Sequence, residues 1–382
     1  MKILIVGAGI AGLTLANVLE KGNMSVDVIE KRDELIHQGS GIMLGLNAVM
    51  ALDRVGLASD IEPIARKINT LRVTDEDEKI ISQTKVSILS DKYKINTFAI
   101  SREALHTMLI DKLKRTRLHL STTILSMNYL GQKIAVHLSN DTIEHYDLVV
   151  GADGIHSRSR YMLLGRQPLR YSGYACWRFL FEHDALESED ILTEMWGKGK
   201  RLGIVPLGKK TGYCFATINT PQNNEKYASM THEECKKLFS EFGGKAKWAL
   251  DSLTDETNLL YDELRDQPDV YFGEEYCILI GDAAHAMTPN MGEGAAMAIE
   301  DAVLLGELLL SGKPNSVIFE KFVQKRKKKV KKVQTQSFKL GKIAQIDFGF
   351  GILMRNSFVK LLPSSLMLKS LESTLIEKGC YE

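Results

Sequence analysis

Three glycines close to the N-terminus have the spacing of a phosphate-binding turn. Gly7, Gly9 and Gly12 follow an apolar, strand-like run at residues 2–6 and precede a helical pattern at residues 10–19. In such a turn the first glycine permits a sharp bend, the second lets a pyrophosphate approach the backbone, and the third lets the helix pack closely on the strand. The helix N-terminus adds free N–H groups and the positive end of its dipole, which favour phosphate.

An acidic residue stands where a dinucleotide-binding unit needs one. The second apolar strand, residues 26–29, ends at Glu30, eighteen positions after Gly12, where a carboxylate can bind ribose hydroxyls. A glycine-rich turn can arise by chance, but here strand, turn, helix, second strand and acid occur in the required order. We therefore predict dinucleotide binding. The residues expected to bind this part of the ligand are Gly7, Gly9, Ile10, Ala11, Gly12, Glu30 and Lys31.

Composition narrows the class of protein. The 382 residues suffice for two domains, and 44% hydrophobic with 25% charged residues is ordinary for a globular chain. A net charge of +1 provides no field that would attract nucleic acid. The five cysteines are scattered without metal-ligand spacing, so we expect no metal and a reducing, cytoplasmic location. No apolar run is long enough to span a bilayer, and the early strand and glycine turn argue against a signal peptide.

The remaining pattern predicts an α/β fold that carries these residues. Apolar strands at 147–151 and 276–280 lead into Asp153-Gly154 and Gly281-Asp282, at the strand ends where ligands bind in open α/β sheets. Alternating strands between 166 and 269 predict an antiparallel sheet. We expect a Rossmann-like, three-layer dinucleotide-binding domain from residues 1–70, 100–165 and 270–345, an inserted antiparallel β-sheet substrate domain from 71–99 and 166–269, and a C-terminal helical tail at 346–382.

Three separated motifs together resemble a known family. They are GAGIAG at 7–12, GADG at 151–154 and GDAAHAMTPNMGEGAAMAIEDA at 281–302. The chain resembles, over nearly its whole length, the class A FAD-dependent monooxygenases of the aromatic-hydroxylase type, such as urate, salicylate and 3-hydroxybenzoate hydroxylases and zeaxanthin epoxidase. The resemblance implies a Rossmann-like FAD-binding domain, NAD(P)H as electron donor, and dioxygen activated as a flavin C4a-hydroperoxide. It implies an aromatic, heteroaromatic or polyene small molecule as substrate.

The resemblance assigns further cofactor contacts. Asp282 matches the acid that binds the ribityl–pyrophosphate region, although an aspartate there could also simply cap a helix. Arg102 matches a basic FAD contact, against the alternative of an exposed ion pair, and Asp153 matches a residue linked to FAD and NAD(P)H. The helix start formed by Gly292, Gly294, Ala295 and Ala296 matches the site of the flavin N1–O2 edge. The chain departs from the family at Glu293, where glutamine is usual, and we expect this side chain to face solvent.

Candidate substrate contacts come from the same resemblance. Arg201 and Tyr213 match residues that face the substrate, and Pro289 matches a proline near the flavin ring. The alternative keeps equal weight, with Arg201 at the surface and Tyr213 as a core residue. His285 fits a supporting residue of the flavin turn better than a general base. Trp177 and Trp196 fit a sheet core better than a stacking platform.

A basic stretch and an apolar tail near the C-terminus each allow two interpretations. The basic run at 325–332 lies in a helical pattern, so a solvated face is favoured over nucleic-acid binding. The tail at 348–368 could touch a membrane, but packing across the dinucleotide-binding domain is favoured.

The resemblance leaves two alternative functions open. They are a tetracycline-inactivating monooxygenase and a non-catalytic FAD-superfamily protein that binds a lipid or protein partner. The chain is expected to be a monomer or homodimer.

Overall fold

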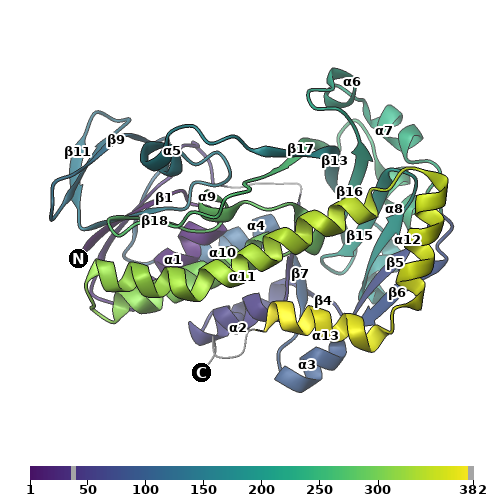
Figure 1. The fold of residues 1–382 in the computed structure, drawn as a ribbon, viewed down its shortest axis with the longest axis horizontal. Coiled ribbons are helices and arrows are strands. Elements are labelled where there is room, and N and C mark those ends of the chain that lie inside the picture. The colour runs from purple at the N-terminus through teal and green to yellow at the C-terminus, as the bar shows by residue number, and fades with distance from the viewer. Residues whose placement is uncertain (36–39, 377–382) are drawn as a thin grey trace.

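The computed structural model describes residues 1–35 and 40–376 and places the N-terminal unit around a six-stranded sheet (Figure 1). The strand order is β18-β19-β12-β1-β2-β8. Neighbours from β19 to β8 are parallel, with Val6 opposite both Gly151 and Ile29, and only β18 is antiparallel. The apolar run of β1 is buried on both faces, as parallel sheets require. The strands are β1 Lys2–Val6, β2 Ser25–Ile29, β8 Arg117–His119, β12 Leu148–Gly151, β18 Gly273–Glu274 and β19 Cys277–Leu279.

Long helices and a small meander complete this unit. Helix α1 (Ile10–Leu19) packs along α10 (Gly294–Leu310), and α10 packs on α11 (Asn315–Ala344). The meander β9 (Ile124–Tyr129), β10 (Ile134–Leu138) and β11 (Ile143–Tyr146) contributes to the same apolar core.

A seven-stranded sheet forms a second unit beside the first (Figure 1). Its order is β17-β13-β16-β15-β14-β5-β6, antiparallel except for the β14–β5 pair. The early strands β5 and β6 join it, as their pattern predicts. One face is apolar and is covered by α7 (His232–Leu238) and α8 (Lys245–Ser252). The strands are β5 Thr70–Thr74, β6 Ile80–Lys85, β13 Arg170–Glu182, β14 Ile191–Trp196, β15 Lys200–Pro206, β16 Thr211–Asn219 and β17 Leu260–Asp266.

Short elements lie between and around the two units. A small sheet, ordered β3-β7-β4, combines β3 (Gly41–Leu44), β7 (Phe98–Ser101) and β4 (Arg66–Lys67). The remaining short elements are α2 Leu46–Arg54, α3 Ser87–Tyr93, α4 Arg102–Asp111, α5 Arg158–Leu164, α6 Glu225–Ala228, α9 Asp282–His285, η1 Ala58–Asp60, η2 Glu62–Ile64, η3 Asp184–Ser188 and η4 Pro289–Met291. The side chain of Ser101 caps α4 by accepting a hydrogen bond from the N–H of Ala104.

Of the two C-terminal helices, only the second packs on the dinucleotide-binding unit as the sequence suggested. Helix α12 (Gly349–Leu361) runs beside β6 of the seven-stranded sheet, rather than across the dinucleotide-binding unit (Figure 1). Helix α13 (Ser364–Leu375) contacts both β6 and α11. The apolar residues Phe350, Leu353 and Phe358 stay exposed because α12 turns only its other side to the sheet. Among the described residues, no helix is long and apolar enough to cross a membrane.

Buried ion pairs fasten α10 to α11. The guanidinium of Arg326 donates to Asp301 Oδ1 at 2.6 Å and also pairs with Glu300, which Lys329 contacts at 2.7 Å. All four side chains are buried. The expectation of a wholly solvated basic face on α11 was therefore wrong at Arg326 and Lys329. The two adjacent buried acids of the mostly apolar α10 need these cations, because an unpaired buried charge is costly.

We predict that Arg326→Ala lowers the free energy of unfolding by about 3–5 kcal/mol, because it leaves two carboxylates buried with one fewer cation. Denaturant unfolding followed by circular dichroism measures the change. The matched control is Lys328→Ala, two positions along the same helix, where the side chain is exposed. Equal stability of the two variants would contradict the role given to this cluster.

Candidate active site

The glycine turn after β1 has the geometry that its spacing predicts. Gly7 has a φ of +105°, and a Cβ there would lie 2.6 Å from the carbonyl oxygen of Ala152. A Cβ at Gly12 would lie 2.0 Å from the carbonyl oxygen of Gly7. At Gly9 a Cβ would meet nothing within 4 Å, so the backbone is open to an approaching ligand. The first and third glycines are thus needed for packing, and the second leaves room for phosphate.

Glu30 is held at the edge of this turn. Its carboxylate accepts hydrogen bonds from the N–H groups of Ala8 at 3.0 Å and Arg32 at 3.2 Å. This places the carboxylate beside the start of α1, where a ribose hydroxyl can reach it. Ile10 and Ala11 are buried in the first turn of α1, and Lys31 is exposed next to Glu30.

A second turn presents Asp282 from the end of β19. Gly281, with a φ of +58°, precedes α9, and its position lies against Ala11 of the first turn. Asp282 is exposed, yet burial raises its pKa, while His285 and Arg102 act in the opposite direction. Both observations hold together if the carboxylate lies on the wall of a recess, open to solvent on one side and enclosed by protein on the others.

Arg102 lies within electrostatic reach of Asp282. It is half-buried, and loss of water lowers its pKa, although Asp282 partly restores the charged form. Its Nε finds no hydrogen-bond partner among the described residues. A buried donor without a partner, an acid beside it and an open glycine backbone suit a ligand with phosphates and hydroxyls, and so fit FAD.

Asp153 and Arg160 each make hydrogen bonds within the protein. Asp153 accepts hydrogen bonds from the hydroxyl of Ser157 at 2.6 Å and the N–H of Ser159 at 2.9 Å, which fixes the start of α5. Burial raises the pKa of Asp153, and these hydrogen bonds oppose the rise. Arg160 donates to the carbonyl oxygens of Ala283 and Ala284, so α5 supports the turn that carries Asp282.

The third turn runs from η4 into α10. Gly292 has a φ of +67°, and a Cβ at Gly294 would meet nothing within 4 Å, so the helix start is open. Pro289 is exposed, Ala295 is half-buried and Ala296 is buried. The positive end of α10 therefore borders open space that a cofactor can occupy.

The position of Glu293 differs from the one expected from the sequence. It does not face solvent: only 3% of its surface is exposed, and it accepts a 2.9 Å hydrogen bond from Asn47 Nδ2. Loss of water raises its pKa to about 7, against the effect of the Asn47 hydrogen bond.

His285 supports the turn rather than facing a ligand. The ring is fully buried, and its Nε2 lies 2.6 Å from Asp301 Oδ2, which also accepts the N–H of Gly281 at 2.9 Å. His285 and Arg326 keep the pKa of Asp301 low despite burial. Sequence reasoning missed Asp301 and Arg326. The signal was present in the two adjacent acids inside the apolar stretch of α10, which required buried cations.

One face of the seven-stranded sheet looks toward these turns. Arg201 pairs with Thr217, and Thr217 pairs with Cys176; because side chains alternate along strands, Arg178, Arg201 and Tyr213 share this face. Arg178 and Arg102 both act on the hydroxyl of Tyr213, whose pKa burial raises far above its ordinary value. Tyr213 also packs over Gly41 of β3.

Arg201 is buried and not at the surface. Its Nε donates to Gln345 Oε1, its Nη1 to Glu194 Oε1 and its Nη2 to Asn290 Oδ1, each at 2.9 Å. Asn290 follows Pro289 in η4, so Arg201 ties β15 to the cofactor-side turn. The structure thus brings Tyr213 toward Arg102 and Arg201 toward Pro289, at opposite ends of the shared face.

Trp177 and Trp196 lie in cores, as expected. Trp177 belongs to the apolar face under α7 and α8. Trp196 is buried with Ile81 and Ala344, and the guanidinium of Arg355 lies 5.1 Å from its ring centre.

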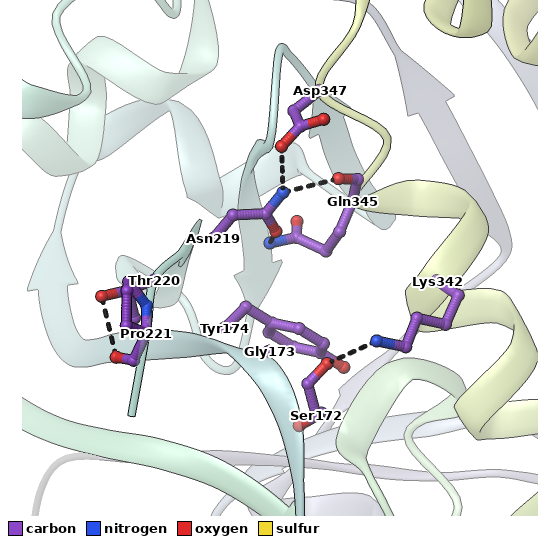
Figure 2. Close-up of a pocket in the computed structure, with 9 residues that line it drawn as sticks. All are labelled: Ser172, Gly173, Tyr174, Asn219, Thr220, Pro221, Lys342, Gln345 and Asp347. Atoms are coloured by element: carbon purple, nitrogen blue, oxygen red, sulfur yellow. Dashed lines mark hydrogen bonds between the residues drawn. The ribbon is translucent and has the colours of Figure 1, made fainter. Parts of the chain in front are cut away.

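A cavity of about 390 Å³ opens where β13 and β16 meet the end of α11 (Figure 2). Tyr174 forms one wall, and its hydroxyl accepts a hydrogen bond from Asn290 Nδ2. Figure 2 shows the amide of Asn219 between Gln345 and Asp347. The residues singled out from the sequence do not line it, because it arises from the contact between distant segments.

Comparisons with known proteins agree with this geometry. The family described as FAD binding domain matches residues 1–337. The chain is 31% identical over 373 residues to the 2-heptyl-3-hydroxy-4(1H)-quinolone synthase of Pseudomonas aeruginosa, covering 96% of this chain and 95% of that protein. It is 27% identical over 365 residues to the aurachin C monooxygenase/isomerase of Stigmatella aurantiaca, covering 95% of each.

A solved structure shows the same fold. Klebsiella pneumoniae HpxO complexed with FAD and uric acid superimposes with a TM-score of 0.89 at 22% identity, covering 98% of this chain and 96% of that one. The chain belongs to the FAD binding domain family and is a class A FAD-dependent monooxygenase, with FAD as cofactor and NAD(P)H as electron donor. The two alternatives, a tetracycline-inactivating enzyme and a non-catalytic binding protein, are not favoured by these relatives.

We predict that Asp282→Ala weakens FAD binding by about tenfold or more, because it removes an acceptor of charge-assisted hydrogen bonds beside Arg102. Quenching of flavin fluorescence on titrating the apoprotein measures the dissociation constant. The control is Glu275→Ala, an exposed acid close to the same strand. Unchanged affinity in the Asp282 variant would remove this residue from the cofactor site.

Proposed function

We propose that this monooxygenase hydroxylates a planar heteroaromatic small molecule of the 2-alkyl-4(1H)-quinolone kind. The observation that carries the proposal is the sheet face shared by Arg178, Arg201 and Tyr213, which lies over the cofactor-side turns. The Pseudomonas aeruginosa relative quoted above, a 2-heptyl-3-hydroxy-4(1H)-quinolone synthase, spans nearly the whole chain and supports this choice of ring system.

In this proposal one unit binds FAD and the other binds the substrate. Residues 1–70, 100–165 and 270–345 form a three-layer FAD-binding domain, residues 71–99 and 166–269 the inserted substrate domain, and residues 346–376 a tail of helices over both. FAD would be held by Gly7, Gly9, Ile10, Ala11, Gly12, Glu30, Lys31, Arg102, Asp153, Asp282, Gly292, Gly294, Ala295 and Ala296. When bound, FAD supplies dioxygen activation with electrons from NAD(P)H.

The chain's own residues orient the substrate and exclude water. Leu180, Val205 and Phe215 give the shared face apolar character around Tyr213. The raised pKa of Tyr213 keeps its hydroxyl protonated throughout the neutral range, so it can donate a hydrogen bond to a ring carbonyl or phenolic oxygen. Arg201 acts through Asn290 by holding the turn that contains Pro289.

The electrostatics favour an electron-rich ring with a polar oxygen. Arg102 and Arg178 are both close enough to Tyr213 to influence its ionisation, and Arg178 also pairs with Asp262 of β17. A carbonyl or deprotonated oxygen of the substrate would be stabilised there. A cytoplasmic location is also proposed, since the four cysteines within the described residues are buried, free thiols.

We predict that NADH or NADPH oxidation in air is stimulated by 2-alkyl-4(1H)-quinolones more than by purines or phenolic acids. The planar bicycle fills the apolar part of the shared face, and its carbonyl meets Tyr213. The test follows absorbance of the reduced nicotinamide across this panel and detects the product by mass spectrometry. If urate or a phenolic acid stimulates nicotinamide oxidation and quinolones do not, the proposed substrate class is wrong.

Tyr213→Phe is predicted to lower kcat/KM by about tenfold and leave FAD affinity unchanged, because it removes only the hydroxyl donor. Steady-state kinetics with the stimulating compound and a flavin titration measure the two effects. The control is Tyr161→Phe on α5, an exposed tyrosine. If the Tyr213 variant keeps full kcat/KM, its hydroxyl does not contact the substrate.

A further inference from the structure

Glu293 is a buried acid at the point where the cofactor-side turn meets α2. It precedes the first residue of α10, and its Oε2 accepts a hydrogen bond from Asn47 Nδ2. Its Oε1 lies close to Gly45, where an added Cβ would be 3.2 Å away. The side chain therefore joins the open start of α10 to the start of α2, two elements far apart in the sequence.

The side-chain oxygen of Asn47 lacks a hydrogen-bond donor among the described residues. This atom, Oδ1, is buried. It lies 2.8 Å from the same Cβ position above Gly45 that Glu293 Oε1 approaches. A carboxylate oxygen cannot donate to this atom, whereas a protonated carboxyl group can. The geometry suits an acid–amide pair, with Asn47 donating to Oε2 and a protonated Oε1 donating back.

The charged neighbours favour the same state. Glu300 on α10 is buried with Arg326 and Lys329 of α11, which keep its pKa low, and the Asn47 amide contributes to this lowering. Glu293 then faces an ionised Glu300 across one amide. Burial has the largest effect on the pKa of Glu293, which is raised to about 7. The negative charge of Glu300 also raises this pKa, whereas the hydrogen bond from Asn47 and the positive charge of Lys329 lower it.

We propose that Glu293 is a positioning residue for FAD, which as the neutral acid pairs with Asn47 and holds the turn Pro289–Gly294 against α2. This fixes the backbone at the start of α10, where a Cβ at Gly294 would meet nothing within 4 Å and where FAD would bind. The inference rests on FAD binding at this turn and is independent of the substrate proposed above.

Ionisation of Glu293 has two consequences for the cofactor. It replaces the returned hydrogen bond with repulsion between two carboxylates, so the turn is held less firmly and FAD affinity falls. It also adds a negative charge near the start of α10, which disfavours the negative charge of a reduced flavin and lowers its reduction potential. Both effects grow as pH rises through the neutral range.

The experiment compares the wild-type protein with Glu293→Gln and Glu293→Ala. Gln keeps a neutral partner for Asn47, and Ala removes it. FAD dissociation constants are measured by fluorescence on the apoproteins from about pH 5.5 to 8.5, and reduction potentials by dye equilibration over the same range. We expect wild-type affinity to fall by about tenfold across this range, the Gln variant to keep the low-pH affinity throughout, and the Ala variant to bind about tenfold more weakly at every pH.

Unfolding of the apoproteins gives a readout without cofactor. The folded-state pKa of Glu293, about 7, lies above its ordinary value of 4.5, so its contribution to stability is full below the lower value and is lost as pH rises through the higher one. The melting temperature of Glu293→Gln should therefore rise relative to wild type between these limits. Glu320→Gln, an exposed glutamate on α11, is the matched control and should follow wild type.

Two outcomes would overturn the inference. One is an identical pH dependence of FAD affinity and potential in wild type and Glu293→Gln. The other is wild-type affinity in a folded Glu293→Ala variant. If the Ala variant does not fold, the comparison of wild type with the Gln variant still decides the matter. Wild-type protein that binds no FAD at any pH would instead contradict the family assignment.

Discussion

The cofactor side of this protein depends on a single buried carboxylate, Asp301. It accepts hydrogen bonds from the N–H of Gly281 and from Arg326, and it lies 2.6 Å from His285 Nε2. These contacts join α10, α11 and the turn after β19. The charge can remain in the core only because its partners compensate the loss of water. The shape of the turn that carries Asp282 is therefore fixed by buried residues that do not themselves face the ligand.

A second set of contacts ties the substrate-side sheet to the same cofactor turns. Arg201 binds Glu194, Gln345 and Asn290. Asn290 also contacts Tyr174 and donates to the carbonyl oxygen of Ser337, so the short segment after Pro289 is held by two strands and by α11. This arrangement lets side chains of one unit be positioned relative to a ligand held by the other. It also explains why a buried arginine can influence the site while each of its three nitrogens is already paired within the chain.

Features set by local backbone rules could be predicted from the sequence, and those set by distant contacts could not. The roles of Gly7, Gly9 and Gly12 follow from steric limits on a tight turn, and the place of Glu30 follows from the length of one strand–helix–strand unit. The buried Glu293 accepts its hydrogen bond from Asn47, which is 246 positions away. The pairing of Arg201 with Gln345 and the packing of α12 on β6 likewise join segments whose proximity no periodicity reveals.

The most direct test of the central claim is a single turnover with isotopically heavy dioxygen. The FAD-loaded protein is reduced by NADPH without oxygen, then mixed with heavy dioxygen and a 2-alkyl-4(1H)-quinolone, and the product is weighed by mass spectrometry. The account predicts a hydroxylated quinolone that carries one heavy oxygen atom, because one atom of dioxygen enters the product and the other leaves as water. Rapid flavin reoxidation with only hydrogen peroxide and unchanged quinolone would contradict the proposed function.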